Sequence, residues 1–271
     1  MKFSLARQRA FDQTLNAPDF VLVYQMGKVG SSSIEASLEH AGIPSWHLHT
    51  FDDNEEFQMY RNTGDVACFF DWPIRAAYKL TLSHRRRILQ KRDHLKIITL
   101  VRDPIATVVS RFFQDLHIQF IAGKKNESIH EDIDATLRHL VDAFETQMRL
   151  EYFTDWFNRE LKRRFGVDVL THIQNPDQNH WRIEQGGRDV LLMKCEAINQ
   201  SAGVLADFLA TPGFQLQSSN EATNKWYSAL YQRFKETYPF ERLFHLYDAP
   251  LYRAIYSEED IAQFKMKWSK R

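Results

Sequence analysis

The chain has 271 residues, of which 44% are apolar and 13% aromatic, and this is enough to bury the core of one large domain. The 35 lysines and arginines balance the 35 aspartates and glutamates, so the composition predicts neither a nucleic-acid partner nor an acidic tail. Two cysteines, Cys68 and Cys195, make no disulfide framework and favour a reducing compartment. The start of the chain has no continuous apolar segment, and no stretch approaches the roughly 20 apolar residues of a membrane helix, so we expect a cytoplasmic protein without a transmembrane segment.

The N-terminal part alternates short apolar runs with amphipathic stretches. Residues 20–25 are apolar and β-branched, as in a buried parallel strand, and helical spacing then continues until Gly42, with a possible capping box at Ser32 and Glu35. Asp103 is expected to cap a further helix that has Pro104 in its first turn. The further elements expected in this part are strands at 44–49, 66–70 and 95–101 and a helix at 73–92.

The second half is mainly helical. Residues 133–164 predict two helices, and a strand returns near residues 189–195. In the tail, Trp226, Leu230 and Phe234 recur at helical spacing. The repeated strand–helix order predicts an α/β fold, with a parallel sheet covered by helices on both faces, a helical insertion and a helical C-terminal tail. We expect a single domain over residues 1–271.

The loop after the first strand has the composition of an anion site. Gly27 and Gly30 allow backbone amides to approach an anion, the following helix directs its N-terminus there, and Lys28 adds a charge. Three serines at 31–33 add hydroxyl donors, although serine-rich turns are also common helix caps. Walker A fits poorly, because Val29 stands where a Mg²⁺-binding Ser or Thr would follow the lysine.

The loop after the strand at 95–101 should lie at the same sheet edge, because ligands of parallel sheets bind at the carboxyl ends of the strands. Arg102 stands at that strand end, and Ser110 lies two turns into the next helix, which we expect to be close enough for both to contact one phosphate.

Together, residues 28–32 (Lys-Val-Gly-Ser-Ser), Arg102-Asp103-Pro104 and Ser110 resemble the paired motifs of the PAPS-dependent sulfotransferases. In that superfamily the first loop binds the 5′-phosphosulfate of 3′-phosphoadenosine-5′-phosphosulfate (PAPS), and the Arg and Ser bind its 3′-phosphate. The resemblance implies a P-loop-like three-layer sandwich, with PAPS as donor, the bisphosphate PAP as product and no metal. It also implies these cofactor-binding residues: Lys28, Val29, Gly30, Ser31, Ser32, Ser33, Arg102 and Ser110.

The C-terminal tail adds a resemblance to one particular family. Residues 224–228, Asn-Lys-Trp-Tyr-Ser, resemble the motif of the NKWYS family, bacterial proteins assigned to capsular polysaccharide synthesis, and residues 246–261 are also similar to that family. Lys225, expected to open a tail helix, is a further candidate for cofactor contact. Residues 191–198 resemble a late strand-then-acid segment of sulfotransferases, with Glu196 as the acid. The implied acceptor is a carbohydrate, and no motif identifies the sugar or an oligomeric state.

For catalysis, Lys28 is expected to stabilise the leaving phosphate oxygen, and His49 is the first candidate for the general base. His49 should end the second strand beside the first loop, on the same face as His47. The alternatives for the base stay open: they are His47, Asp71, His84 and Glu35. The basic run at 84–87, with Lys91 and Arg92, either receives an anionic sugar or forms a solvated helix face.

Two other functions remain open from the sequence. The first is a P-loop kinase of sugars or nucleotides, which would require Mg²⁺ and ATP. The second is a non-catalytic PAP-binding module in polysaccharide assembly, which would bind PAP without transferring a group.

Overall fold

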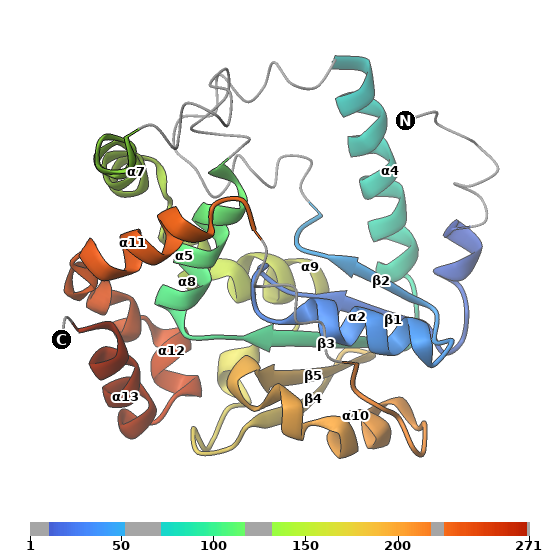
Figure 1. Cartoon of the computed structure of the whole chain (residues 1–271). Helices are drawn as coiled ribbons and strands as arrows, with labels where there is room; N and C mark the ends of the chain where they lie inside the picture. The colour runs from blue at the N-terminus through green and yellow to red at the C-terminus, as the bar shows by residue number, and fades with distance from the viewer. Residues whose placement is uncertain (1–10, 52–71, 117–131, 218–224, 270–271) are drawn as a thin grey trace. The chain divides into compact units, whose positions relative to one another are not determined.

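The computed structural model describes residues 11–51, 72–116, 132–217 and 225–269, and these form two compact units (Figure 1). The first unit contains the described residues 11–51, 72–102 and 156–217, and the second contains 103–116, 132–155 and 225–269. In the described part of the chain, no helix is both long enough and apolar enough to cross a membrane. The strand expected at 66–70 lies outside the described residues, as does the Asp71 candidate.

A five-stranded sheet forms the centre of the first unit, in the order β2-β1-β3-β5-β4. The neighbours β1–β2, β1–β3 and β3–β5 are parallel, so the fold is mixed α/β with a mostly parallel sheet, as expected. β1 is fully buried, because a parallel strand between two helical layers contacts apolar side chains on both faces. The strands are β1 (Val21–Tyr24), β2 (Ser45–Leu48), β3 (Leu95–Val101), β4 (His180–Gln185) and β5 (Arg188–Lys194).

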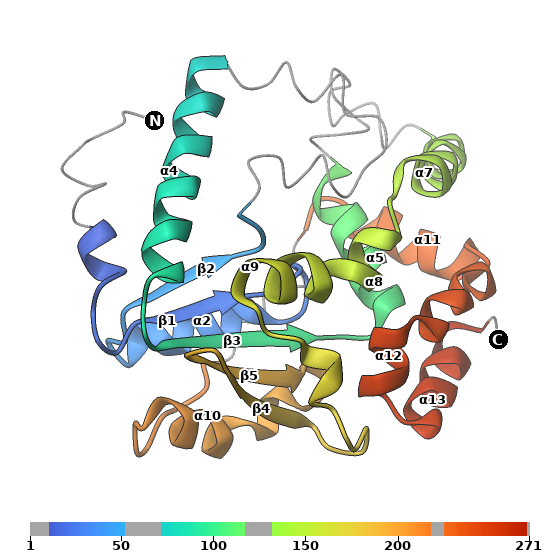
Figure 2. The ribbon, with the colours of Figure 1, turned by 180° about the vertical axis from the view of Figure 1, so that it is seen from behind.

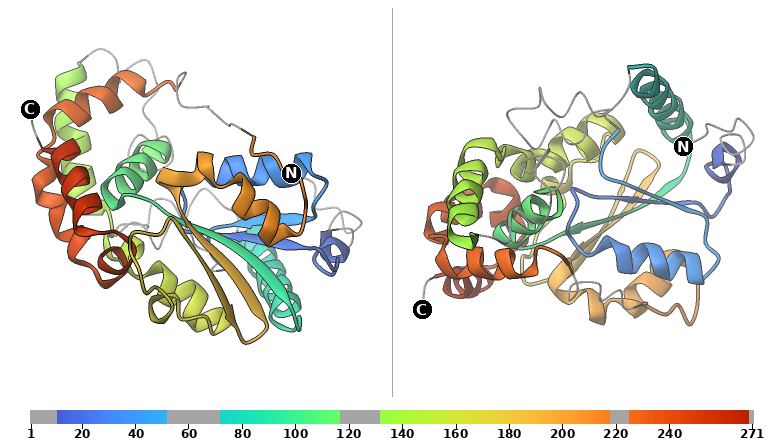
Figure 3. Two further views of the ribbon diagram at one scale, coloured as in Figure 1. Left: turned by 90° about the horizontal axis from the view of Figure 1, so that it is seen from below. Right: turned by 45° about the horizontal axis from the view of Figure 1, so that its top comes forward.

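Helices cover both faces of this sheet (Figures 2 and 3). On one face lie α2 (Ser31–His40) and α10 (Ala202–Leu209), and on the other lie α4 (Trp72–Gln90) and α9 (Arg163–Phe165). A π-helical turn, η3 (Asn158–Lys162), leads directly into α9. Short 3₁₀ segments follow α9 and β5: η4 (Val169–Thr171) and η5 (Cys195–Gln200).

The antiparallel hairpin of β4 and β5 departs from the expected wholly parallel sheet. β4 alternates exposed and buried residues, and Gly186 and Gly187 both take positive φ at the turn. A Cβ at Gly187 would lie 2.1 Å from the Asp93 carbonyl oxygen, so only glycine fits there. Arg188 fixes the same end of the sheet by donating to the carbonyls of Gln90 and Arg92, both at 2.7 Å.

The second unit is helical, and a buried aspartate links its segments. Asp103 caps α5 by accepting from the Ile105 N–H at 3.1 Å, as the sequence predicts. Its carboxylate also accepts from the Tyr247 hydroxyl at 2.9 Å and from the Trp268 indole N–H at 2.6 Å. This side chain therefore joins the start of the unit to its last helices. The elements are α5 (Pro104–Gln114), α7 (Ile133–Gln147), α8 (Glu151–Phe157, which ends in the first unit), α11 (Ser228–Thr237), η7 (Phe240–Asp248), α12 (Pro250–Ile255) and α13 (Glu258–Trp268).

Two local predictions are wrong. The N-cap of α2 is Gly30 in a left-handed conformation, with no side-chain cap, rather than a Ser32–Glu35 capping box. Trp226 and Lys225 precede α11, which begins at Ser228, so Lys225 does not open that helix. The other expected helices and strands of the described residues are present, with ends within a few residues of those predicted.

Candidate functional site

The carboxyl ends of β1 and β3 form the switch point of the sheet. From β1 the chain passes through α2 to β2 on one side, and then through α4 to β3 on the other side. Ligands of open α/β sheets bind in the crevice beyond the strand ends at such a point. The loop at residues 25–30 and Arg102 both lie there, as the sequence predicts.

The backbone of this loop is left-handed at three of four consecutive positions. Gly27, Lys28 and Gly30 have φ of 92°, 62° and 88°, and Lys28 is one of only two non-glycine residues with positive φ among the described residues. A left-handed L-residue costs roughly 1–2 kcal/mol, and such strain is typical of functional loops. Neighbouring residues of opposite backbone handedness, here Val29 and Gly30, can turn successive N–H groups toward one concavity, as in an anion-binding nest. The N-terminus of α2 follows immediately.

Arg102 holds the loop from the neighbouring strand. Its Nη1 donates to the Lys28 carbonyl oxygen at 3.0 Å, so the two sequence motifs meet within the first unit. Behind the loop lies Cys195, at the end of β5: a Cβ at Gly30 would be 2.9 Å from its Sγ. Burial raises the pKa of the Cys195 thiol to about 11, with Arg102 opposing the rise and Glu196 adding to it, so the thiol is neutral at physiological pH. A neutral thiol therefore lies behind the loop, close enough to the Arg102 guanidinium for that charge to act on its pKa.

Gln25 connects the loop to both candidate histidines. Its side-chain oxygen accepts from the Gly27 N–H, which orients the amide so that Nε2 faces away from the loop. That nitrogen lies 2.8 Å from Ser31 Oγ, 2.7 Å from His47 Nε2 and 2.9 Å from His49 Nδ1. The two imidazole rings are in edge contact, with centroids 4.8 Å apart, as expected for residues on one face of β2.

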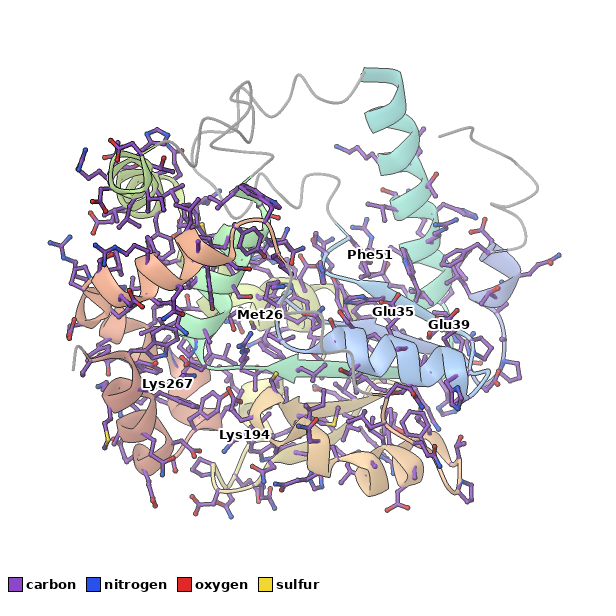
Figure 4. The ribbon with its side chains drawn as sticks, viewed as in Figure 1. Met26, Glu35, Glu39, Phe51, Lys194 and Lys267 are labelled. Atoms are coloured by element: carbon purple, nitrogen blue, oxygen red, sulfur yellow. The ribbon has the colours of Figure 1, made fainter. Side chains whose placement is uncertain are left out.

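These contacts assign a tautomer to His47. His47 Nδ1 faces a Glu35 carboxylate oxygen at 3.0 Å, so it carries the proton, and His47 Nε2 accepts from Gln25 (Figure 4 labels Glu35 on α2). His49 Nδ1 has two neighbours of opposite kind: the Gln25 carbonyl oxygen at 3.1 Å, which only accepts, and the Gln25 side-chain Nε2 at 2.9 Å, which only donates. Gln25 therefore contacts the Nδ1 side of the His49 ring in either neutral tautomer.

The remaining predicted residues are distributed as follows. Val29 and Ser31 are buried, whereas Ser32 is exposed on the first turn of α2. Ser110 and Lys225 belong to the second unit, so their contact with a ligand at the Lys28 loop stays a prediction.

The basic run on α4 is partly a structural element of the first unit. Arg85 donates to Asp12 at 3.0 Å, and its guanidinium lies 4.2 Å from the ring centroid of Phe11. His84, one alternative base, has its Nε2 at 3.6 Å from the other oxygen of Asp12. Among the side chains of this run, these two contact the N-terminal segment, which favours the structural interpretation for them.

Three polar residues of this region were not predicted from the sequence. Gln25 looked like the last residue of a strand, and Thr50 and Glu160 carried no motif. Glu160 is 1% exposed, and its Oε1 accepts from Thr50 Oγ1 at 3.0 Å. A polar residue at the end of an otherwise apolar strand run was a signal for Gln25, but no local pattern indicates a pair 110 residues apart.

One protein family matches part of the chain. The family is NKWYS, described as "Putative capsular polysaccharide synthesis protein", and the match covers residues 128–251, less than half of the sequence. This confirms the likeness to the NKWYS family that residues 224–228 predict. The match begins after the Lys28 loop and Arg102, so it contains neither of them. No curated protein and no solved structure matches the chain.

Proposed function

We propose that the chain is a sulfotransferase, which moves a sulfuryl group from PAPS to a hydroxyl of a carbohydrate. The similarity to a family named for capsular polysaccharide synthesis supports a saccharide acceptor. The donor is inferred from the Lys28 loop and from the sequence resemblance of its motif to that of PAPS-dependent enzymes.

The observation that carries the proposal is the strained loop bound to Arg102 at the switch point. Three left-handed residues precede a helix N-terminus, and an arginine from the neighbouring strand bonds the loop backbone. A strained backbone, a lysine and an arginine at one sheet edge fit a ligand with several phosphate charges. Val29, buried where a nucleotide kinase loop has its Mg²⁺-binding hydroxyl, favours a donor that needs no metal.

In the proposed reaction the acceptor oxygen attacks sulfur, an O–S bond forms, and the S–O bond to the 5′-phosphate of PAP breaks. In this proposal His49 carries its own proton on Nδ1 toward the Gln25 carbonyl oxygen, 3.1 Å away, and takes the acceptor proton at Nε2. The Lys28 ammonium stabilises the negative charge that develops on the leaving phosphate oxygen. His47 keeps its proton on Nδ1 toward Glu35 and orients Gln25, which in turn orients His49.

Calorimetry with PAP, ADP and ATP tests the donor. Hydrogen bonds to charged groups contribute about 1.5–3 kcal/mol each, so two of them on a 3′-phosphate should favour PAP over ADP by at least about 100-fold, without Mg²⁺. Arg102→Ala should remove most of this preference, and Ser110→Ala tests whether the second unit contributes. Arg182→Ala, which removes an arginine paired with Asp189 on the same sheet, is the control. Equal affinities for PAP and ADP, or an ATP preference that requires Mg²⁺, would overturn the proposal in favour of a kinase.

Transfer itself is measured with ³⁵S-labelled PAPS and a panel of glycans. Lys28→Ala should lower the rate by about 10²- to 10³-fold, the usual loss when a transition-state donor is removed. His49→Ala should lower it by roughly 10²- to 10⁴-fold while PAP affinity stays within a few fold, and the wild-type rate should rise with pH through the histidine range. PAP binding without transfer to any acceptor would indicate a non-catalytic module. Loss of activity in His47→Ala alone would move the base to His47.

A further inference from the structure

A buried carboxylate, that of Glu160, bonds residues at the ends of the two strands that carry the candidate site. Glu160 is 1% exposed, sits in the π-helical turn η3, and accepts from three groups. Tyr24, the last residue of β1, donates its hydroxyl to one oxygen, and Arg164 Nε donates to the same oxygen at 2.6 Å. Thr50, just beyond β2, donates to the other oxygen at 3.0 Å. One carboxylate therefore joins the ends of β1 and β2 to the helix behind them.

Trp156, one turn before Glu160 in the same helical segment, bonds the backbone of His49. Trp156 precedes Glu160 by four residues, and its indole N–H donates to the His49 carbonyl oxygen at 2.8 Å. The side chains of Trp156 and Glu160 thus bind the backbone of His49 and the side chain of Thr50. Two consecutive residues at the strand end are held from a single helix. π-helical turns occur frequently at functional sites, because the extra residue redirects side chains.

Burying the Glu160 carboxylate among aromatic rings costs free energy unless both of its oxygens accept hydrogen bonds. Tyr24 packs against the rings of Phe51, Trp156 and Phe165, with centroids 5.3, 5.0 and 5.8 Å away. A carboxylate among aromatic rings loses much of its hydration, and its hydrogen bonds are correspondingly strong and directional. Apolar side chains of similar volume would fill this part of the core without the cost of removing a charge from water. Three donors on one buried carboxylate point to a fixed geometry at the strand ends.

We propose that Glu160, acting through Thr50 and together with Trp156, is a positioning residue that fixes the His49 segment and thereby the orientation of its imidazole. The catalytic use of that orientation rests on the function proposed above, but the positioning itself does not. Loss of the Thr50 bond should allow the His49 backbone to move relative to Gln25, whose carbonyl and amide both lie near Nδ1. The hydrogen bonds of His49 would then change, and its titration with them.

Thr50→Val is the variant that tests this, because it removes the hydroxyl and keeps the shape of the side chain. Thr99→Val is the matched control: Thr99 is also fully buried in the first unit, on β3, and its Oγ1 has no hydrogen-bond partner among the described residues. Glu160→Gln removes the charge, and its control is Asp115→Asn, since Asp115 forms a buried i,i+4 pair with Arg111 at 2.7 Å in the second unit. The Glu160–Arg164 pair has the same spacing, at 2.6 Å.

The readout is the NMR titration of the His49 imidazole in the full-length protein, assigned with His49→Gln. We expect Thr50→Val and Glu160→Gln to shift its midpoint by at least about half a pH unit, and the two controls to leave it in place. If transfer is observed, kcat should fall at least about 10-fold in Thr50→Val while PAP affinity stays within a few fold. A Thr50→Val midpoint identical to that of Thr99→Val would overturn the proposal. A shifted midpoint in a protein that transfers no sulfuryl group would support the positioning and refute only the function.

Discussion

Gly30 lies where the Lys28 loop becomes helix α2, and replacing it with alanine should destabilise the first unit in two separable ways. Its φ of 88° is unfavourable for any L-residue, and a Cβ there would lie 2.9 Å from Cys195 Sγ and 3.6 Å from Ile198 Cδ1. The first effect costs roughly 1–2 kcal/mol. The second forces the half-buried side chain of Cys195 to move, at about 1–3 kcal/mol. Gly30→Ala should therefore lower the free energy of unfolding by roughly 2–5 kcal/mol.

Gly166 offers the matched control for the backbone effect alone. It lies in the same unit, its φ is 73°, and a Cβ there would meet no atom within 4 Å. Gly166→Ala should therefore lose only the backbone contribution, roughly 1–2 kcal/mol. Urea unfolding followed by circular dichroism compares the two variants, and calorimetry with PAP should show lost affinity in Gly30→Ala alone.

The double variant Gly30→Ala/Cys195→Ala isolates the contact with sulfur. Removing Sγ makes room for the new methyl group, so the two substitutions should be less harmful together than the sum of their separate effects. For residues in contact, such coupling is about 0.5–3 kcal/mol. Equal destabilisation by Gly30→Ala and Gly166→Ala, together with zero coupling, would refute the inference that the loop packs against Cys195.

Two further predictions concern buried groups of the two units. In a Cys68→Ser background, Cys195 should react with iodoacetamide at pH 8 at least about 10-fold more slowly than a thiol with the ordinary pKa of 9.0, because its own pKa is about 11 and the smaller thiolate fraction outweighs the higher nucleophilicity of its thiolate. Rapid alkylation at pH 8 would contradict the burial of the thiol. Because the pKa is higher in the folded state than the ordinary value of 9.0, the contribution of Cys195 to the free energy of unfolding should be complete below pH 9 and decline as the pH rises through 11. Asp103→Ala should lower the unfolding free energy by at least about 3 kcal/mol, because it leaves the buried Tyr247 hydroxyl and Trp268 indole without their shared acceptor. A loss below about 1 kcal/mol in denaturant unfolding would show that the two donors find other partners.

The sequence predicted those strands and helices whose limits depend on interactions between residues close together in the chain. β3 is an apolar run between polar residues, and Asp103 followed by Pro104 is a helix start at any position in a fold, so both were found with nearly correct ends. The β4–β5 hairpin was missed although residues 181–184 alternate in polarity and a Gly-Gly pair follows them, because the strand–helix repeat favoured a wholly parallel sheet.

Within the candidate site, the same division appears. Lys28 and Arg102 were predicted to lie at one sheet edge, because parallel strands place their carboxyl ends together. Glu160 could not be predicted, because its bonds to Tyr24 and Thr50 span 136 and 110 residues and no periodicity encodes them. The glycine cap of α2 was missed for a different reason: Ser32 and Glu35 match the spacing of a capping box, but the left-handed loop places the N-cap two residues earlier, at Gly30.

The order of strands in the sheet also has a consequence for synthesis of the protein. β3 and β5 are hydrogen-bonded neighbours, yet residues 102–187 separate them in sequence, and 103–155 of these belong to the second unit. On the ribosome, β3 can pair with β1 early, but its other edge has no partner until the chain has passed Lys194. An unpaired strand edge is a template for wrong association. A fragment that ends soon after Arg102 would contain the Lys28 loop and three strands of the sheet, but it would expose that edge permanently and lack Cys195, which packs against Gly30.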